Sequence, residues 1–394
     1  AFADQAPQPK PLQSLLAGMP RSRRAPLPLL LQLLLALRAA LAVPPHRKLK
    51  LPNGHGAIPI LGLGTADASS SGPPFTCADA VEAALRMGYR HIDTAVFYEN
   101  HRDIAQGIER SGVPREEIWI TSKLAMHGGM LKLKGEPGAD ATRAFVQDML
   151  EELQTSYIDL VLVHFPGVQG SGLRVKDGLD EFEGDVERAY SIRREIWMEL
   201  QMQREMGHVR NIGVSNYLVP HLEELRTYSA QLPAVNQLEL HPYLPRRDVL
   251  DWCRAHGVVV EAYGSVVQDI YRDLLEEEAV REIATQHSAT PAQVALAWAM
   301  RRDIVVLPKS SREERIEENA KAVDLELSDA EEARLDALDC SLPGSKCRFP
   351  TRCGDFCGRG VYYWDPSRVP VSSRTPQVQP AVPSEPSPSG RSEL

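Results

Sequence analysis

The sequence predicts a (β/α)8 barrel of the TIM type with an N-terminal β-hairpin cap. Between residues 47 and 345, eight short runs rich in apolar and β-branched residues alternate with segments of helical spacing. Each run is apolar enough for burial on both faces, which is typical of parallel strands covered by helices. After the first run, LGLGTADASSSG lacks the third glycine of a dinucleotide-binding turn, which disfavours an open doubly wound sheet. Eight units in about 300 residues fit a closed barrel.

The strands are expected in these eight runs, in chain order: AIPILGLG (57–64), YRHIDTA (89–95), EIWITSKL (117–124), YIDLVLVHF (157–165), VRNIGVSN (209–216), AVNQLEL (234–240), GVVVEAYG (257–264) and DIVVLPKS (303–310). Helical spacing occurs between them at 77–88, 141–154, 192–207, 219–228, 246–257 and 290–302. Thr290 and Pro291 are typical of an N-cap and a first helical position. Gly88, Gly207 and Gly257 follow helical segments as stop signals should.

Before the barrel, the segment KLKLPNGHGAIPI has an Asn-Gly pair, Asn53 and Gly54, between two apolar runs. That pair is a strong hairpin signal. We expect the hairpin to cover the bottom of the barrel, away from the carboxyl ends of the strands.

Composition limits the functions that the chain can have. The formal net charge is -9 and the pI about 5.7, which argues against broad nucleic-acid binding but leaves room for a local basic phosphate pocket. Four of the six cysteines, at 340, 347, 353 and 357, cluster near the end without a common zinc spacing. Free thiols or disulfides are favoured there over a metal site, and no metal is expected.

Residues 1–46 and 346–394 are expected to lie outside the barrel domain, which is assigned to 47–345. The N-terminal stretch RSRRAPLPLLLQLLLALRAALAVPP pairs an arginine cluster with a leucine-rich run, which favours a secretory or organelle targeting segment. The alternative is an unstructured leader on a cytoplasmic protein. Membrane association is expected only through this segment. The C-terminal stretch is rich in Pro and Ser and is predicted to be disordered, and it ends in RSEL, two positions away from an ER-retention signal.

Polar residues stand where the predicted strands end, and in a barrel these ends carry the active site. Reading them in order gives Thr65, Asp93, Lys123, His164, Ser215 with Asn216, Gln237, Tyr263, and Lys309 with Ser310. Any one of them has an ordinary structural explanation. Together they predict a ring of polar groups around one mouth.

From about Lys48 to Cys340 the chain resembles the aldo-keto reductases. The resemblance rests on GYRHIDTA, ITSKL, LVHFP, IGVSN, NQLELHP and LPKSS with a following arginine, in the family's order. It implies NADPH-dependent reduction of an aldehyde or ketone to an alcohol by a monomer. The family's four catalytic residues have matching positions at Asp93, Tyr98, Lys123 and His164.

The chemistry of these side chains suits that reaction. When a nicotinamide gives hydride to a carbonyl carbon, the oxygen needs a proton, and Tyr98 is the expected donor. A free phenol has a pKa of about 10, and the nearby Lys123 ammonium is expected to lower it. Asp93 would hold Lys123 in place, and His164 would orient the carbonyl oxygen.

The resemblance also implies the cofactor contacts. Tyr263 would stack on the nicotinamide, and Ser215, Asn216 and Gln237 would hold its carboxamide. Cations and hydroxyls after the last strand suit the 2′-phosphate of NADPH. The residues carried over for the phosphate and the adenine are Lys309, Ser310, Ser311, Arg315, Glu318 and Asn319.

Several departures from the family pattern bear on the pocket. Three positions that often hold tryptophan are Ala66, Ala125 and Phe165, which predicts a substrate wall with less indole surface. His101 replaces an acid and is expected to start a helix outside the chemistry. Insertions at 126–140 and 168–185 follow the third and fourth strands. After the seventh, Ser265 and Val266 are only weakly assigned to the pyrophosphate, because the family's Pro-Leu-Gly is missing.

Two other functions compete with the reductase. Some relatives bind NADPH and serve mainly as regulatory partners of membrane channels, and the apolar N-terminal segment keeps that alternative open. An unrelated barrel enzyme, such as an isomerase, would have to contain the four matching residues by chance. The substrate is expected to be a small-molecule carbonyl compound, with no nucleic-acid partner. The missing tryptophans predict either a bulkier substrate or insertions that refill the space.

Overall fold

The computed structural model describes residues 47–66, 75–124, 138–166, 174–175, 182–183, 186–266 and 272–340. The predicted leader and the C-terminal tail lie outside these residues. The strands are β1 (Lys48–Lys50), β2 (Ala57–Pro59), β3 (Leu63–Gly64), β4 (His91–Asp93), β5 (Trp119–Leu124), β6 (Ile158–Val163), β7 (Arg174–Val175), β8 (Phe182–Glu183), β9 (Val209–Ser215), β10 (Val235–Glu239), β11 (Val259–Tyr263) and β12 (Val305–Val306).

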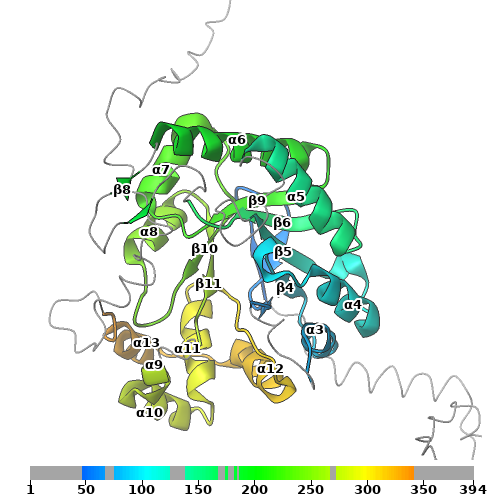
Figure 1. Ribbon diagram of the computed structural model, residues 1–394. Helices are drawn as coiled ribbons and strands as arrows, with labels where there is room; N and C mark the ends of the chain where they lie inside the picture. The colour runs from blue at the N-terminus through cyan, green and yellow to red at the C-terminus, as the bar shows by residue number, and fades with distance from the viewer. Residues whose placement is uncertain are drawn as a thin grey trace, which may run out of the picture. The chain divides into compact units, whose positions relative to one another are not determined.

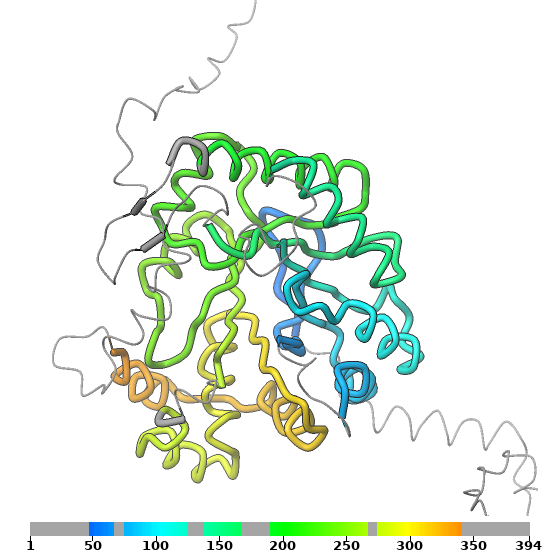
Figure 2. The backbone as a smooth tube through the Cα atoms, in the orientation of Figure 1, coloured from blue at the N-terminus to red at the C-terminus, as the bar shows by residue number. Residues whose placement is uncertain are grey.

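The helices carry the labels used in Figure 1. They are α3 (Cys77–Arg86), α4 (His101–Ser111), α5 (Ala139–Glu152), α6 (Val186–Glu205), α7 (Val219–Tyr228), α8 (Arg247–Ala255), α9 (Arg272–Glu276), α10 (Glu278–Gln286), α11 (Pro291–Met300), α12 (Glu313–Ala320) and α13 (Asp329–Asp336). Short 3-10 turns are η3 (Val96–Tyr98), η4 (Arg115–Glu117) and η6 (Lys321–Asp324). The tube in Figure 2 follows the alternation of strand and helix in chain order.

The eight predicted strand regions form one parallel sheet in the order β12-β11-β10-β9-β6-β5-β4-β3. The bridges Leu61↔Val306 and Gly64↔Lys309 join its two edges, so that the sheet closes into a barrel. Helices lie around the strands in Figure 1, as the (β/α)8 prediction requires. The fold class is therefore confirmed.

The first predicted strand is shorter than the sequence suggested. Ala57–Pro59 of the run AIPILGLG pairs with β1 in the hairpin, and only Leu63–Gly64 forms β3. Between them, Gly62 leaves no space for a side chain, because a Cβ there would lie 2.8 Å from the His91 ring. The apolar run was continuous, so its pattern gave no sign of this division.

The predicted hairpin is present, and it lies across the starts of the strands. Its Asn53 Nδ2 donates to the carbonyl oxygen of His256, and its His55 N–H donates to Asn211 Oδ1 at 2.6 Å. Asn211 lies near the start of β9 and also donates to the Asp159 carbonyl oxygen near the start of β6. An apolar cluster shared by the hairpin and the barrel fills this end: Leu51, Ile58, Trp119, Leu160, Leu162, Ala234, Val235, Val305 and Leu307.

The helix signals in the sequence are matched by the backbone. The Thr290 hydroxyl accepts from the Gln293 N–H, with Pro291 as the first residue of α11. The predicted stop residues Gly88, Gly207 and Gly257 all have positive φ, the left-handed region in which glycine is not strained. In the part of the chain that the structure describes, no helix is both long and apolar enough to span a bilayer.

Substituting alanine for Gly64 is expected to destabilise the barrel at its closing seam. A Cβ on Gly64 would lie 2.8 Å from the carbonyl oxygen of Leu307, a backbone atom that cannot rotate away. We expect Gly64→Ala to lower the free energy of unfolding by about 1–3 kcal/mol, measured by urea denaturation. An unchanged midpoint would mean that the seam between β3 and β12 opens without cost.

Candidate active site

The catalytic candidates meet at the carboxyl ends of β4, β5 and β6. Asp93 ends β4, and the 3-10 turn η3 then carries Tyr98 back over the strand end, with the Tyr98 N–H bonded to the Ala95 carbonyl oxygen. Glu99 follows with φ of 51°, a left-handed conformation that a non-glycine residue rarely adopts. This turn explains the five-residue spacing between Asp93 and Tyr98.

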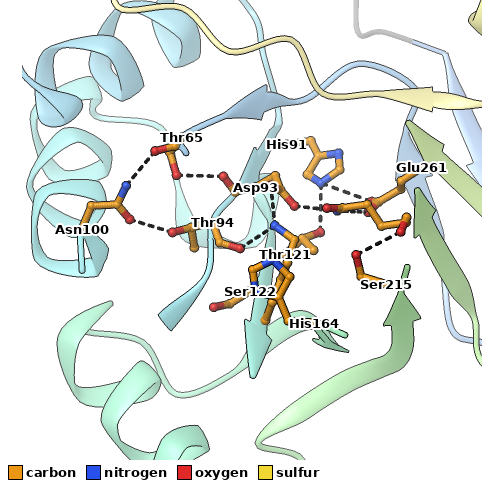
Figure 3. Close-up of polar contacts among 12 residues, drawn as sticks. Thr65, His91, Asp93, Thr94, Asn100, Thr121, Ser122, His164, Ser215 and Glu261 are labelled. Atoms are coloured by element: carbon orange, nitrogen blue, oxygen red, sulfur yellow. Dashed lines mark hydrogen bonds and ion pairs between the residues drawn. The ribbon is translucent and has the colours of Figure 1, made fainter. Parts of the chain in front are cut away.

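Lys123 lies at the centre of the site and is fully buried. Its Nζ donates to Asp93 Oδ1 at 2.6 Å and to the Thr94 carbonyl oxygen at 2.9 Å (Figure 3). The same nitrogen lies 5.1 Å from the centroid of the half-buried Tyr98 ring. The structure thus places the ammonium between the carboxylate and the phenol.

Burial and charge act in opposite directions on this ion pair. Burial is the largest single effect on Lys123 and lowers its pKa, but Asp93, Tyr98 and Glu261 together outweigh burial and hold the pKa above its ordinary value. Burial raises the pKa of the Asp93 carboxyl, and Lys123 and Gln237 oppose that rise. The short contact favours the charged pair, because each buried ion then has its partner.

A second layer of hydrogen bonds fixes the segment that carries Asp93. The Thr65 hydroxyl donates to the Asp93 carbonyl oxygen, and the Thr94 hydroxyl donates to Asn100 Oδ1 at 2.7 Å. The Asn100 amide donates in turn to the carbonyl oxygen of Thr65. Figure 3 shows these residues on the side of the site opposite Glu261.

His164 lies just beyond the end of β6 and faces Tyr98. The two ring centroids are 6.1 Å apart in an edge-on arrangement, and His164 stacks on Phe165 with centroids 4.4 Å apart. Phe165, predicted as a substrate contact, therefore also limits the rotation of His164. Ala66 lies next to the end of β3, and Ala125 lies outside the described residues.

The residues predicted for the carboxamide are linked to one another. Tyr263 Oη donates to Asn216 Oδ1 at 2.8 Å, and the Asn216 amide donates to Ser215 Oγ and to the His164 carbonyl oxygen. Ser215 Oγ donates to the Gln237 carbonyl oxygen. Asn216 is in the left-handed region with φ of 63°, so the backbone turns to direct its amide at this point. These groups join the nicotinamide candidates to the catalytic ones.

The predicted phosphate residues follow β12 and enter α12. Lys309 and Arg315 are exposed, and among the described residues neither has a carboxylate within ion-pair distance. Ser310 Oγ is part of a turn with Arg312, and Ser311 is half-buried. Arg312, which the sequence reasoning missed, adds a third exposed cation at the start of this helix.

Other predicted contacts already serve the fold. Glu318 accepts from the Thr290 hydroxyl at 2.6 Å, which ties α12 to the start of α11, and Asn319 is buried beside it. Ser265 is buried and bonded to the backbone of β11, and Val266 is half-buried. Most of the two insertions lies outside the described residues, apart from the antiparallel pair β7–β8 and the start of α5.

His101 lies outside the polar cluster, as expected. It is the first residue of α4, and its ring bonds Ser122 Oγ at 3.0 Å and Glu152 at 3.3 Å. Serine, histidine and an acid in this order could suggest a hydrolase. Ser122 is fully buried, however, so this set joins β5 to the surrounding helices and offers no hydroxyl to a substrate.

One residue of the site gave a signal that the sequence reasoning did not use. Glu261 lies in the middle of VVVEAY, a run assigned to a strand buried on both faces. An acid at such a position must face a partner inside the barrel. The structure places Glu261 beside Gln237, whose amide nitrogen also donates to Asp93.

Comparison with known proteins agrees with this geometry. The model of the Aldo/keto reductase family matches residues 60–339. The chain is 36% identical to the glyoxal reductase of Bacillus subtilis over 290 residues, which cover 74% of this chain and 92% of that protein. It is 35% identical to the methylglyoxal reductase DkgB of Salmonella typhi, over 72% of this chain and 94% of that protein.

Solved structures give the same result. The aldose reductase of Schistosoma japonicum matches with a TM-score of 0.65 and 30% identity, over 80% of this chain and 98% of that one. The shared barrel, the matched span and the polar cluster at its mouth lead to one conclusion. The chain is a member of the aldo/keto reductase family, and it is an oxidoreductase that acts on carbonyl groups.

Proposed function

We propose that the chain reduces aldehydes or ketones to alcohols with NADPH, and that Tyr98 supplies the proton. The observation that carries the proposal is the buried ion pair of Lys123 and Asp93 against the Tyr98 ring, with Nζ 5.1 Å from the ring centroid. An ammonium there stabilises the negative charge that develops on the phenol as its proton leaves.

Each group has one part in the reaction. Bound NADPH supplies the hydride. Tyr98 donates its proton to the carbonyl oxygen, and His164, edge-on to the Tyr98 ring, donates a hydrogen bond that orients the same oxygen. Asp93 keeps the Lys123 ammonium in place.

The preference for NADPH is supported by the unpaired cations after β12. Lys309 and Arg315 are exposed and have no carboxylate partner among the described residues, so that they can pair with a 2′-phosphate. Small carbonyls are the first substrates to test, because two relatives are named as glyoxal and methylglyoxal reductases. Larger carbonyls belong in the same panel, because Ala66 and Phe165 stand where indole surface would narrow the pocket.

The direct test is turnover by the unmodified chain. NADPH oxidation is followed with glyoxal, methylglyoxal and larger aldehydes and ketones, and repeated with NADH. We expect turnover with the small carbonyls and a preference for NADPH. Tight NADPH binding without turnover on any carbonyl would contradict the proposal and favour a regulatory subunit.

Arg315→Ala is expected to weaken NADPH selectively. Loss of one charge-assisted contact to a phosphate should raise the KM for NADPH by about 10-fold or more, with little change for NADH. Arg226→Ala, which removes an exposed arginine from α7, is the matched control. An equal rise for both cofactors would show that Arg315 acts on the fold and not on the 2′-phosphate.

A further inference from the structure

A second carboxyl lies inside the barrel close to the catalytic ion pair. Glu261, in the middle of β11, is fully buried, and its Oε2 accepts from Gln237 Nε2 at 2.7 Å. The same nitrogen donates to Asp93 Oδ2 at 2.8 Å. One amide nitrogen therefore bridges two carboxyl groups, and of these two it is Asp93 that accepts from Lys123.

Among the residues that the structure describes, the neighbourhood of Glu261 contains no second cation. Its Oε1 has no hydrogen-bond partner among the described residues and lies 3.7 Å from His91 Nε2. Burial lowers the pKa of His91 to about 3, so the ring is neutral. His91 Nε2 also lies 3.0 Å from Thr121 Oγ1, which accepts from the Trp119 N–H.

The count of charges then decides which acid holds a proton. With both acids ionised, Lys123 would leave one uncompensated negative charge among buried groups, which is costly. Burial, with the Asp93 charge next, raises the pKa of Glu261 to about 8, while Gln237 and Lys123 oppose this. Glu261 is therefore neutral at pH 7.

The other titratable groups near β11 do not change this balance. On β10, Glu239 pairs in register with Tyr263, further along the strand, and its Oε1 lies 3.6 Å from His241 Nε2. On the other side, β12 contributes only Val305 and Val306. The groups that act on Glu261 are Asp93, Lys123 and the neutral His91.

We propose that Glu261, joined to Asp93 through the Gln237 amide nitrogen, is a positioning residue of the active site whose negative charge offsets that of Lys123 and so helps to keep the proton on the Tyr98 phenol. Glu261 and Tyr98 both interact with the charge of Lys123. Alone, the ammonium would draw the proton off the phenol as the pH rises. An ionised Glu261 offsets part of that attraction. This role rests on the proposed function, in which Tyr98 is the proton donor.

The test compares the unmodified chain with Glu261→Gln and Glu261→Leu, neutral residues at every pH. In both variants the alkaline limb of kcat/KM for carbonyl reduction should move to lower pH by about one unit, and alcohol oxidation should begin at correspondingly lower pH. Tyrosinate absorbance, taken as the difference from the same chain carrying Tyr98→Phe, should show the same shift without turnover. Asp159→Asn removes another buried carboxyl, near the start of β6, and should leave the alkaline limb of kcat/KM at the pH of the unmodified chain.

Stability gives a readout that does not depend on turnover. The folded state holds the Glu261 proton more tightly than the unfolded chain, because its pKa is raised from 4.5 to about 8. That contribution is fully present below pH 4.5 and is lost as the pH rises to about 8. Relative to Glu261→Gln, the unmodified chain should therefore lose stability across this range and no further above it.

These outcomes distinguish the role of Glu261 from the proposed function of the chain. The role of Glu261 would be overturned if the unmodified chain turns over and neither variant shifts the alkaline limb of kcat/KM or the tyrosinate titration. Failure of the unmodified chain on every carbonyl would overturn the proposed function, and the tyrosinate titration would still decide whether Glu261 controls Tyr98.

Discussion

Tyr98→Phe is expected to lower kcat for carbonyl reduction by about 10²–10⁴-fold, the range that a positioned general acid contributes. The ring, its contact with His164 and its place on η3 all remain, so the change removes only the hydroxyl. NADPH binding should be retained, since Tyr98 is not among the cofactor residues. The measurement pairs steady-state turnover on methylglyoxal with NADPH titration by fluorescence.

Tyr190→Phe is the matched control for this substitution. It removes a phenolic hydroxyl from α6 that contacts Thr227, on the outside of the barrel, and turnover should be unchanged. If Tyr98→Phe kept the turnover of the unmodified chain, the proton would have to come from another group, and His164 would be the next donor to test.

Lys123→Met should remove activity and also destabilise the fold. The substitution leaves the Asp93 carboxyl, 4% exposed, without its cation and next to Glu261. Breaking a buried pair from one side costs about 3–5 kcal/mol. Denaturant unfolding near pH 7 measures this loss, and turnover at a temperature where the variant is folded measures the catalytic one.

The double substitution Lys123→Met with Asp93→Asn separates the two effects. It removes both charges, so most of the lost stability should return, while turnover should stay low because no ammonium faces Tyr98. If the double variant were as unstable as Lys123→Met alone, the cost would lie in packing around Lys123 and not in the unpaired charge.

The sequence predicted the barrel because its strands are buried on both faces and each is followed by a polar residue at the mouth. It could not predict the division of the first strand, since the apolar run through Ile60 and Leu61 is continuous. The separation depends on how closely Gly62 approaches His91, a contact between residues 29 positions apart. The periodicity of apolar residues in a short stretch of sequence carries no information on a contact between residues so far apart in the chain.

For the site, the positions of Asp93, Lys123 and His164 followed from the ends of their strands. The hydrogen-bond partners of these and other side chains in the site did not follow from the strand ends. Gln237 was expected to face the cofactor's carboxamide, whereas its amide nitrogen is engaged by two carboxyls inside the barrel. Glu318 was expected at the adenine, and its carboxylate is bonded to Thr290. Both partners come from other strands or helices, which periodicity cannot assign.

The structure describes three of the six cysteines. Cys77 and Cys253 are buried free thiols. Cys340 is disulfide-bonded, which agrees with disulfides over a metal site at that position, and its partner lies outside the described residues.

The apolar cluster beneath the hairpin has a consequence for the order of events in each cycle. Leu51 and Ile58 pack with Leu160, Val305 and Leu307 and close that end of the barrel, so among the described residues the carboxyl ends of the strands are the side left for the substrate. In the proposed reaction, Tyr98 regains its proton at the same mouth by which the alcohol leaves. An alcohol that leaves slowly also delays the return of the proton to Tyr98. Such alcohols should therefore inhibit more strongly than their affinity alone suggests.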